Sequence, residues 1–145
     1  MPFRFPLASV LRLRESMEMR EEVALQKAQF EVARVRRRVD ELTDELAAAC
    51  QEREKALART VPANRLQQIQ AEIDAAEEAK QILSETLETL KRQRDVQMKL
   101  YMTAHNGRRM IADLLTQQRN QYEQEQIRAQ QKRIDDIVAA RWQRT

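Results

Sequence analysis

A single glycine, Gly107, occurs in the 145 residues of the chain, together with only three prolines. Turns depend on glycine, proline and asparagine, so a chain this poor in glycine and proline can reverse its direction at very few places. Charged residues make up 34% of the sequence and aromatic residues 4%, which leaves little material for a thick core. This composition is typical of a long helix or coiled coil. It excludes a sheet protein, a Rossmann domain and a disulfide scaffold.

Pro62 is the only proline away from the N-terminus. Proline removes a helix hydrogen bond and restricts the residue before it to extended conformations, so a helix should end here. Asn64 and Gln67 have the spacing of an N-cap and its capping-box partner, which predicts that a helix restarts at Asn64. The expected elements are a helix over about 6–59, a loop over about 60–64 and a helix over about 64–140.

Apolar residues recur at alternating steps of four and three in both predicted helices, which is the spacing of a coiled-coil seam. The positions that flank the seam on each helix are expected to be charged and to face water. Folding at Pro62 gives an all-α fold, a long two-helix antiparallel coiled-coil hairpin that forms a single domain. The predicted layers near the loop pair Leu42 with Leu83, Val39 with Leu87, and Val35 with Leu90, and farther out Ala28 faces Gln97.

The second helix is longer than the first, so residues 119–145 are expected to overhang the N-terminus. This overhang carries apolar side chains that a lone helix in water cannot bury, namely Tyr122, Ile127, Ile134, Ile137, Val138 and Trp142. We therefore expect it to dock on a partner.

The net charge of +3 conceals a segregation along the chain. Residues 1–38 carry nine basic and five acidic side chains, residues 39–90 carry five and twelve, and residues 91–145 carry twelve and six. The hairpin should thus have an acidic loop end and a basic end that holds both termini. Within the basic end, Glu18 and Arg108 are expected to form an ion pair. Nucleic acid is not an expected partner, because a basic patch that reads it usually comes with a recognisable module or stacking aromatics.

The sequence contains no catalytic constellation. With one histidine (His105), one cysteine (Cys50) and no glycine-rich phosphate loop, we expect no metal, no cofactor and no small-molecule substrate. No stretch approaches the roughly 18 apolar residues of a membrane span, and a cytoplasmic, non-enzymatic protein is expected. Gly107, inside the second helix, costs about 1 kcal/mol relative to alanine. It is either a flexible point, a close-approach site or a tolerated substitution.

The opening segment, from Phe3-Arg4-Phe5-Pro6-Leu7 to Arg12-Leu13-Arg14-Glu15, resembles the N-terminus of the flagellar export protein FliJ family. That family often begins with an aromatic-basic-aromatic triplet, a leucine, then Val-Leu and a basic-acidic pair, although Ala8 here replaces a common acidic residue. The family's length and its interruption before a longer second helix are also similar.

The resemblance implies a stalk that is similar to the central stalk of rotary ATPases. Its terminal end would enter the hexameric export ATPase of the flagellar type III apparatus, and the stalk would also contact the export-gate membrane protein and export chaperones. Such a protein would be peripheral at the cytoplasmic face of the inner membrane. The open alternatives are the equivalent stalk of a virulence-type secretion system, a basic coiled coil that binds nucleic acid, and a self-associating structural coiled coil.

The resemblance also assigns two sets of contact residues. The expected ATPase-facing residues are Leu7, Val10, Leu11, Leu13, Arg14, Arg133, Ile134 and Trp142. The expected export-gate residues are Arg38, Leu42, Glu45, Ala49, Glu72, Ala76, Ala79 and Leu83. Leu42 and Leu83 are also predicted seam residues, so a core role is the alternative for both.

Overall fold

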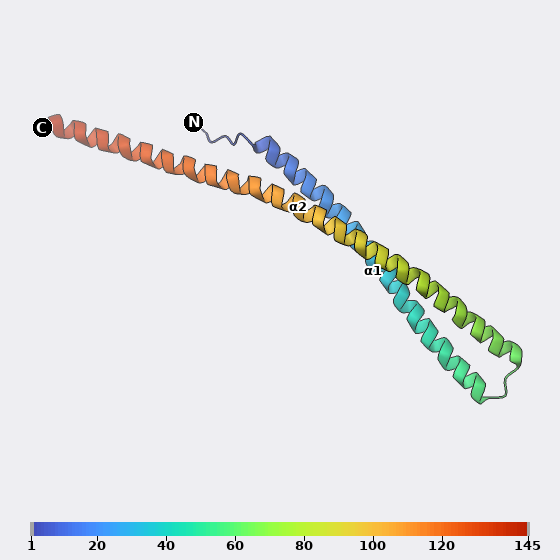
Figure 1. Cartoon of the computed structure of the whole chain (residues 1–145). Helices are drawn as coiled ribbons and strands as arrows, with labels where there is room; N and C mark the ends of the chain where they lie inside the picture. The colour runs from blue at the N-terminus through green and yellow to red at the C-terminus, as the bar shows by residue number, and fades with distance from the viewer. Residues whose placement is uncertain (1, 145) are drawn as a thin grey trace. The chain divides into compact units, whose positions relative to one another are not determined.

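Two α-helices account for nearly all of residues 2–144, which are the residues that the computed structural model describes. Helix α1 spans Ala8–Ala58 and helix α2 spans Ala63–Arg144, and the short connection between them contains Pro62 (Figure 1). The described residues contain no strand. The all-α helical hairpin predicted from the glycine count and the heptad spacing is confirmed.

The chain divides into two compact units, which we describe separately. The loop unit is Glu21–Tyr101 and contains the connection between the helices. The terminal unit consists of the described residues before Glu21 and after Tyr101, and so combines the start of α1 with the last part of α2. Each unit therefore takes one segment from each helix.

Helix α1 starts from a tight turn. The amide of Ala8 donates to the carbonyl of Phe5 at 3.1 Å, and the amide of Leu11 donates to the carbonyl of Leu7 at 2.8 Å. Pro6 lies inside this turn, where its fixed φ suits the bend and its missing N–H is not needed. It therefore precedes α1 and does not occupy the first helical position.

Helix α2 starts immediately after Pro62, one residue before the predicted N-cap. The amide of Arg65 donates to the carbonyl of Pro62 at 3.0 Å. Asn64 is consequently inside the helix, and the predicted capping box with Gln67 is wrong. The physical reason is that the φ of proline is already fixed near helical values, so Pro62 can begin the first turn itself.

The core of the loop unit consists of two apolar clusters. In the cluster next to the loop, Ala56, Ile69 and Ile73 are buried. In the second cluster, Val32, Val35 and Leu87 are buried, and the half-buried Val39, Leu83 and Leu90 pack against them. Five residues of the predicted layers therefore gather in one cluster, namely Val35, Val39, Leu83, Leu87 and Leu90, as the antiparallel seam requires.

At Gln97 the seam of the loop unit contains a polar side chain that forms hydrogen bonds across the two helices. Its amide donates to the backbone carbonyl of Glu21 at 3.3 Å and also to the carboxylate of Glu21. The predicted partner was Ala28, which offers no polar group to a half-buried amide. The side chain of Gln97 therefore reaches along α1 to Glu21, because a buried donor without an acceptor is costly.

The described part of the chain, residues 2–144, contains no helix that combines the length and the apolar character needed to cross a membrane.

Candidate functional site

The terminal unit contains all eight of the predicted ATPase-facing residues, but it does not bring them together. Leu7, Val10, Leu11 and Arg14 are half-buried at the start of α1, and Leu13 on the same helix is exposed. Arg133, Ile134 and Trp142 are exposed near the end of α2. The structure thus places the two groups on separate helices.

An aromatic contact joins the segment before α1 to helix α2 in the terminal unit. The rings of Phe3 and Tyr122 have their centroids 5.5 Å apart, and the guanidinium of Arg119 lies 5.9 Å from the centroid of Phe3. Every described residue after Tyr122 is exposed. The overhang therefore begins at Glu123, four residues later than predicted. We call residues 123–144 the tail.

The tail carries an apolar row on one side. At about 100° of rotation per residue, Ile127, Ile134, Val138 and Trp142 fall on a single narrow strip of the helix. All four side chains are exposed. A helix gains little stability in water from apolar side chains that are this exposed, so the row is a candidate docking surface.

A polar cluster interrupts the seam of the terminal unit. One carboxylate oxygen of Glu18 lies 3.0 Å from Nδ1 of His105, and the other accepts from Nε of Arg108. The predicted Glu18–Arg108 ion pair is thus confirmed, and His105 is an additional member that sequence reasoning missed. The hydrogen bond from His105, supported by the bond and charge of Arg108, holds the pKa of Glu18 below its ordinary value of 4.5, against the opposing effect of burial.

The lowered pKa of Glu18 predicts how acid affects the terminal unit. Because this carboxyl ionises more easily in the folded chain than in the unfolded one, its stabilising contribution is fully present above about pH 4.5 and is lost as the pH falls through the lowered pKa. We expect the free energy of unfolding to decrease on acidification in this range, measured by urea unfolding at a series of pH values. Glu18→Gln should show a weaker decrease, and an unchanged slope in this variant would contradict the assignment.

Gly107 lies against the side chain of Arg14 in the terminal unit. A Cβ atom built on Gly107 would be 3.2 Å from Nη1 of Arg14. The glycine does not have a positive φ, so its backbone does not require the absence of a side chain. Of the readings left open by the sequence, the structure supports a close approach, here between α2 and the end of a flexible side chain.

The predicted export-gate residues all lie in the loop unit, where three of them belong to its core. Leu42 is only 3% exposed, Leu83 packs against the Val32 cluster, and Ala49 packs against the cluster of Ile69. These three side chains hold the hairpin together. A partner could reach that of Leu42 only if the two helices separated.

The remaining predicted gate residues are more accessible. Nη1 of Arg38 lies 3.2 Å from a carboxylate oxygen of Glu45 and 3.0 Å from one of Glu41, and all three side chains are exposed. Glu72 is exposed, and Ala76 and Ala79 are half-buried. The structure therefore joins Arg38 and Glu45 into one charged group on α1, to which it adds Glu41.

One row of α2 in the loop unit departs from the expectation that positions beside the seam are charged. The row runs one residue before each seam position, with the same alternating steps of four and three. Nearest the loop this row contains Arg65 and Glu72, but from Ala75 to Leu100 none of its members carries a charge: Ala75, Ala79, Ile82, Thr86, Thr89, Gln93, Val96 and Leu100. Apart from the half-buried Ala79, they are exposed. The heptad count could have revealed this uncharged row, because its spacing is visible in the sequence.

Residues 2–144 contain no group of three His, Cys, Asp or Glu side chains placed to hold a metal ion. Cys50 is half-buried and packs against the Ile69 cluster.

Comparison with known protein families identifies the family of the chain. The model of a protein family described as "Flagellar FliJ protein" matches residues 3–145, which is nearly the whole chain. No curated protein and no solved structure was found to match.

Proposed function

Because the chain belongs to the flagellar FliJ family, we propose that it is a non-enzymatic stalk of the flagellar type III protein export apparatus. Membership of this family supports a role in flagellar export. In the proposal, the terminal unit docks in the hexameric export ATPase, while the loop unit contacts the export-gate membrane protein and export chaperones. The stalk would work at the cytoplasmic face of the inner membrane.

The exposed tail is the observation that carries the proposal. Its apolar row of Ile127, Ile134, Val138 and Trp142 is exposed, and the basic side chain of Arg141 lies beside it. A helix of this kind is suited to a groove or socket whose wall is apolar and whose rim is acidic. A subunit ring with a central opening supplies such a socket, which is why we assign the ATPase to this end.

The charged group on α1 is the best candidate in the loop unit for the gate contact. Arg38, Glu41 and Glu45 are exposed and already ordered by their own ion pairs. Exposed charges of this kind contribute little to the stability of the hairpin but can determine which partner binds and how fast. Among the predicted gate residues, we therefore assign the contact to Arg38 and Glu45, and a core role to Leu42 and Leu83.

Docking of the tail is tested by adding charge to its apolar row. In a pull-down with the hexameric export ATPase, we expect Ile134→Asp and Val138→Asp together to weaken binding at least about tenfold, because a carboxylate would be buried without a partner. The matched control is Ala129→Asp with Ala140→Asp, which adds the same two charges on the opposite side of the tail. This control should bind as the unmodified chain does.

Equal binding by both double variants would overturn docking through the tail row. Circular dichroism of each variant shows whether the helix is intact, so a loss of binding cannot be confused with a loss of folding. If the pull-down recovers no ATPase even with the unmodified chain, the stalk proposal itself fails.

A further inference from the structure

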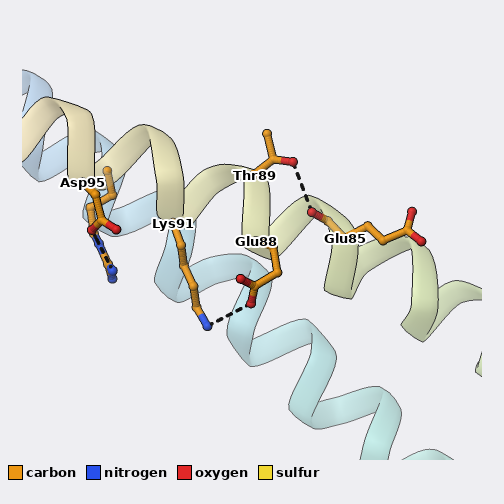
Figure 2. Close-up of polar contacts among 6 residues, drawn as sticks. Glu85, Glu88, Thr89, Lys91 and Asp95 are labelled. Atoms are coloured by element: carbon orange, nitrogen blue, oxygen red, sulfur yellow. Dashed lines mark hydrogen bonds and ion pairs between the residues drawn. The ribbon is translucent and has the colours of Figure 1, made fainter.

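The uncharged row on α2 of the loop unit has the properties of a second coiled-coil seam. Ile82, Val96 and Leu100 are 56%, 59% and 50% exposed, so half or more of each side chain faces water. The hydroxyl of Thr86 donates to the carbonyl of Ile82 at 3.0 Å. The hydroxyl of Thr89 donates to the carbonyl of Glu85 at 3.2 Å (Figure 2). Both threonine donors are thus used inside the helix, which makes the row less polar than its composition indicates.

Charged residues at seven-residue intervals border the uncharged row on the side away from α1. They are Glu78, Glu85, Arg92 and Lys99, and all four are exposed. In coiled-coil terms they occupy one repeated position next to the seam, where charges determine the choice and orientation of the partner helix. Their order along α2 is two acidic residues followed by two basic residues.

This order is complementary to itself when a second copy of α2 runs in the opposite direction. Antiparallel alignment sets Glu78 of one copy against Lys99 of the other, and Glu85 against Arg92. Each pair then occurs twice, because the dimer has two-fold symmetry. A parallel alignment would set this position against Leu83, Leu90 and Gln97, which offer no charge. The charge order therefore selects the antiparallel arrangement.

The same antiparallel alignment also gives reasonable layers between the two uncharged rows. It places Ala79 against Val96 and Ala75 against Leu100, so that a small residue meets a larger one in both of these layers, and it places Ile82 against Gln93. Thr86 meets Thr89 at the centre. Small residues opposite larger ones allow two helices to approach closely and fill the interface without voids.

We propose that the uncharged row of the loop unit is a self-association surface, on which α2 of a second copy packs in the antiparallel direction. The occupant is identified by charge complementarity, since the row and its charged border on one copy match the same residues of another. The proposal uses residues of the loop unit alone and does not rest on the stalk function. It leaves the tail and its docking row out of the interface.

Charge reversal tests the proposal on the full chain. We expect the unmodified protein to dimerise with rising concentration in sedimentation equilibrium, and the variant Glu78→Lys with Glu85→Lys to associate at least about tenfold more weakly, because all the border pairs become repulsive. The variant Arg92→Glu with Lys99→Glu should fail in the same way. An equimolar mixture of the two variants should associate again, because every pair is then of opposite charge.

This recovery in the mixture separates the proposal from a folding defect, since a misfolded variant would not regain binding when it is mixed. A second measurement tests the alignment. With Cys50→Ser as background, Thr86→Cys and Thr89→Cys chains should form a disulfide-linked dimer when they are mixed and oxidised. Neither chain should cross-link efficiently alone.

Two results would overturn self-association through this row. One is an unmodified chain that stays monomeric at the highest concentration at which it remains soluble. The other is association that persists unchanged in both charge-reversed variants, which would place the interface elsewhere. Efficient cross-linking of Thr86→Cys with itself would likewise exclude the antiparallel alignment.

Discussion

Replacing Ile73 with alanine is expected to lower the free energy of unfolding by about 2–5 kcal/mol. Ile73 is 1% exposed and forms the cluster next to the loop with Ile69 and Ala56. Truncation removes buried apolar area and leaves a cavity, because two helices joined by a short loop can close the space only partly. A narrow two-helix seam has few other apolar layers, so this loss is a large fraction of its total stability.

The measurement is urea unfolding followed by circular dichroism, with Ile127→Ala as the matched control. The chemical change is the same, but Ile127 is 65% exposed on the tail, so its truncation should change the free energy of unfolding by less than about 0.5 kcal/mol. Similar effects of the two substitutions would contradict the assignment of Ile73 to the core. They would also mean that the cluster beside the loop contributes little to stability.

Leu42 gives the second large effect, and this residue separates a core role from a contact role. We expect Leu42→Ala to cost about 2–5 kcal/mol of unfolding free energy, because its side chain is almost completely buried between the helices. Arg38→Ala, four residues earlier, removes only exposed ion pairs with Glu41 and Glu45 and should cost less than about 1 kcal/mol.

Binding to the export-gate protein provides the complementary measurement. If the charged group on α1 makes the gate contact, Arg38→Ala should weaken binding while the hairpin remains as stable as before. Leu42→Ala should weaken binding only under conditions in which the hairpin itself unfolds. A fully folded Leu42→Ala chain that no longer binds would show that Leu42 contacts the partner, and would contradict its assignment to the core.

The sequence predicted the hairpin because the physical signals were local and repeated. One interior proline in a chain with one glycine leaves a single place to reverse direction, and the heptad spacing identified the layers of Val35, Val39 and Leu87. The start of α2 was predicted one residue late, because Pro62 competes with Asn64 to begin the helix and the spacing of side chains does not decide between them.

The candidate site was less predictable, because a surface depends on what the rest of the chain covers. The family resemblance assigned both Leu42 and Arg38 to the gate contact, although the fold buries Leu42 and exposes Arg38. It started the overhang at residue 119, whereas the contact between Phe3 and Tyr122 extends the paired part of the terminal unit. The uncharged row was visible as spacing, but only exposure identified it as a surface.

By itself the sequence determined that this chain forms two long helices, where they separate and which side of each faces the other. Those properties follow from backbone conformation and from the period of the apolar residues, both of which act over a few residues. The tertiary structure decided the partners of side chains distant in sequence. Glu18 meets His105 as well as Arg108, Gln97 reaches Glu21, and Arg14 lies over the one glycine. Long side chains reach across several residues of a facing helix, so the contact each one makes depends on the local packing and polar partners of the folded hairpin.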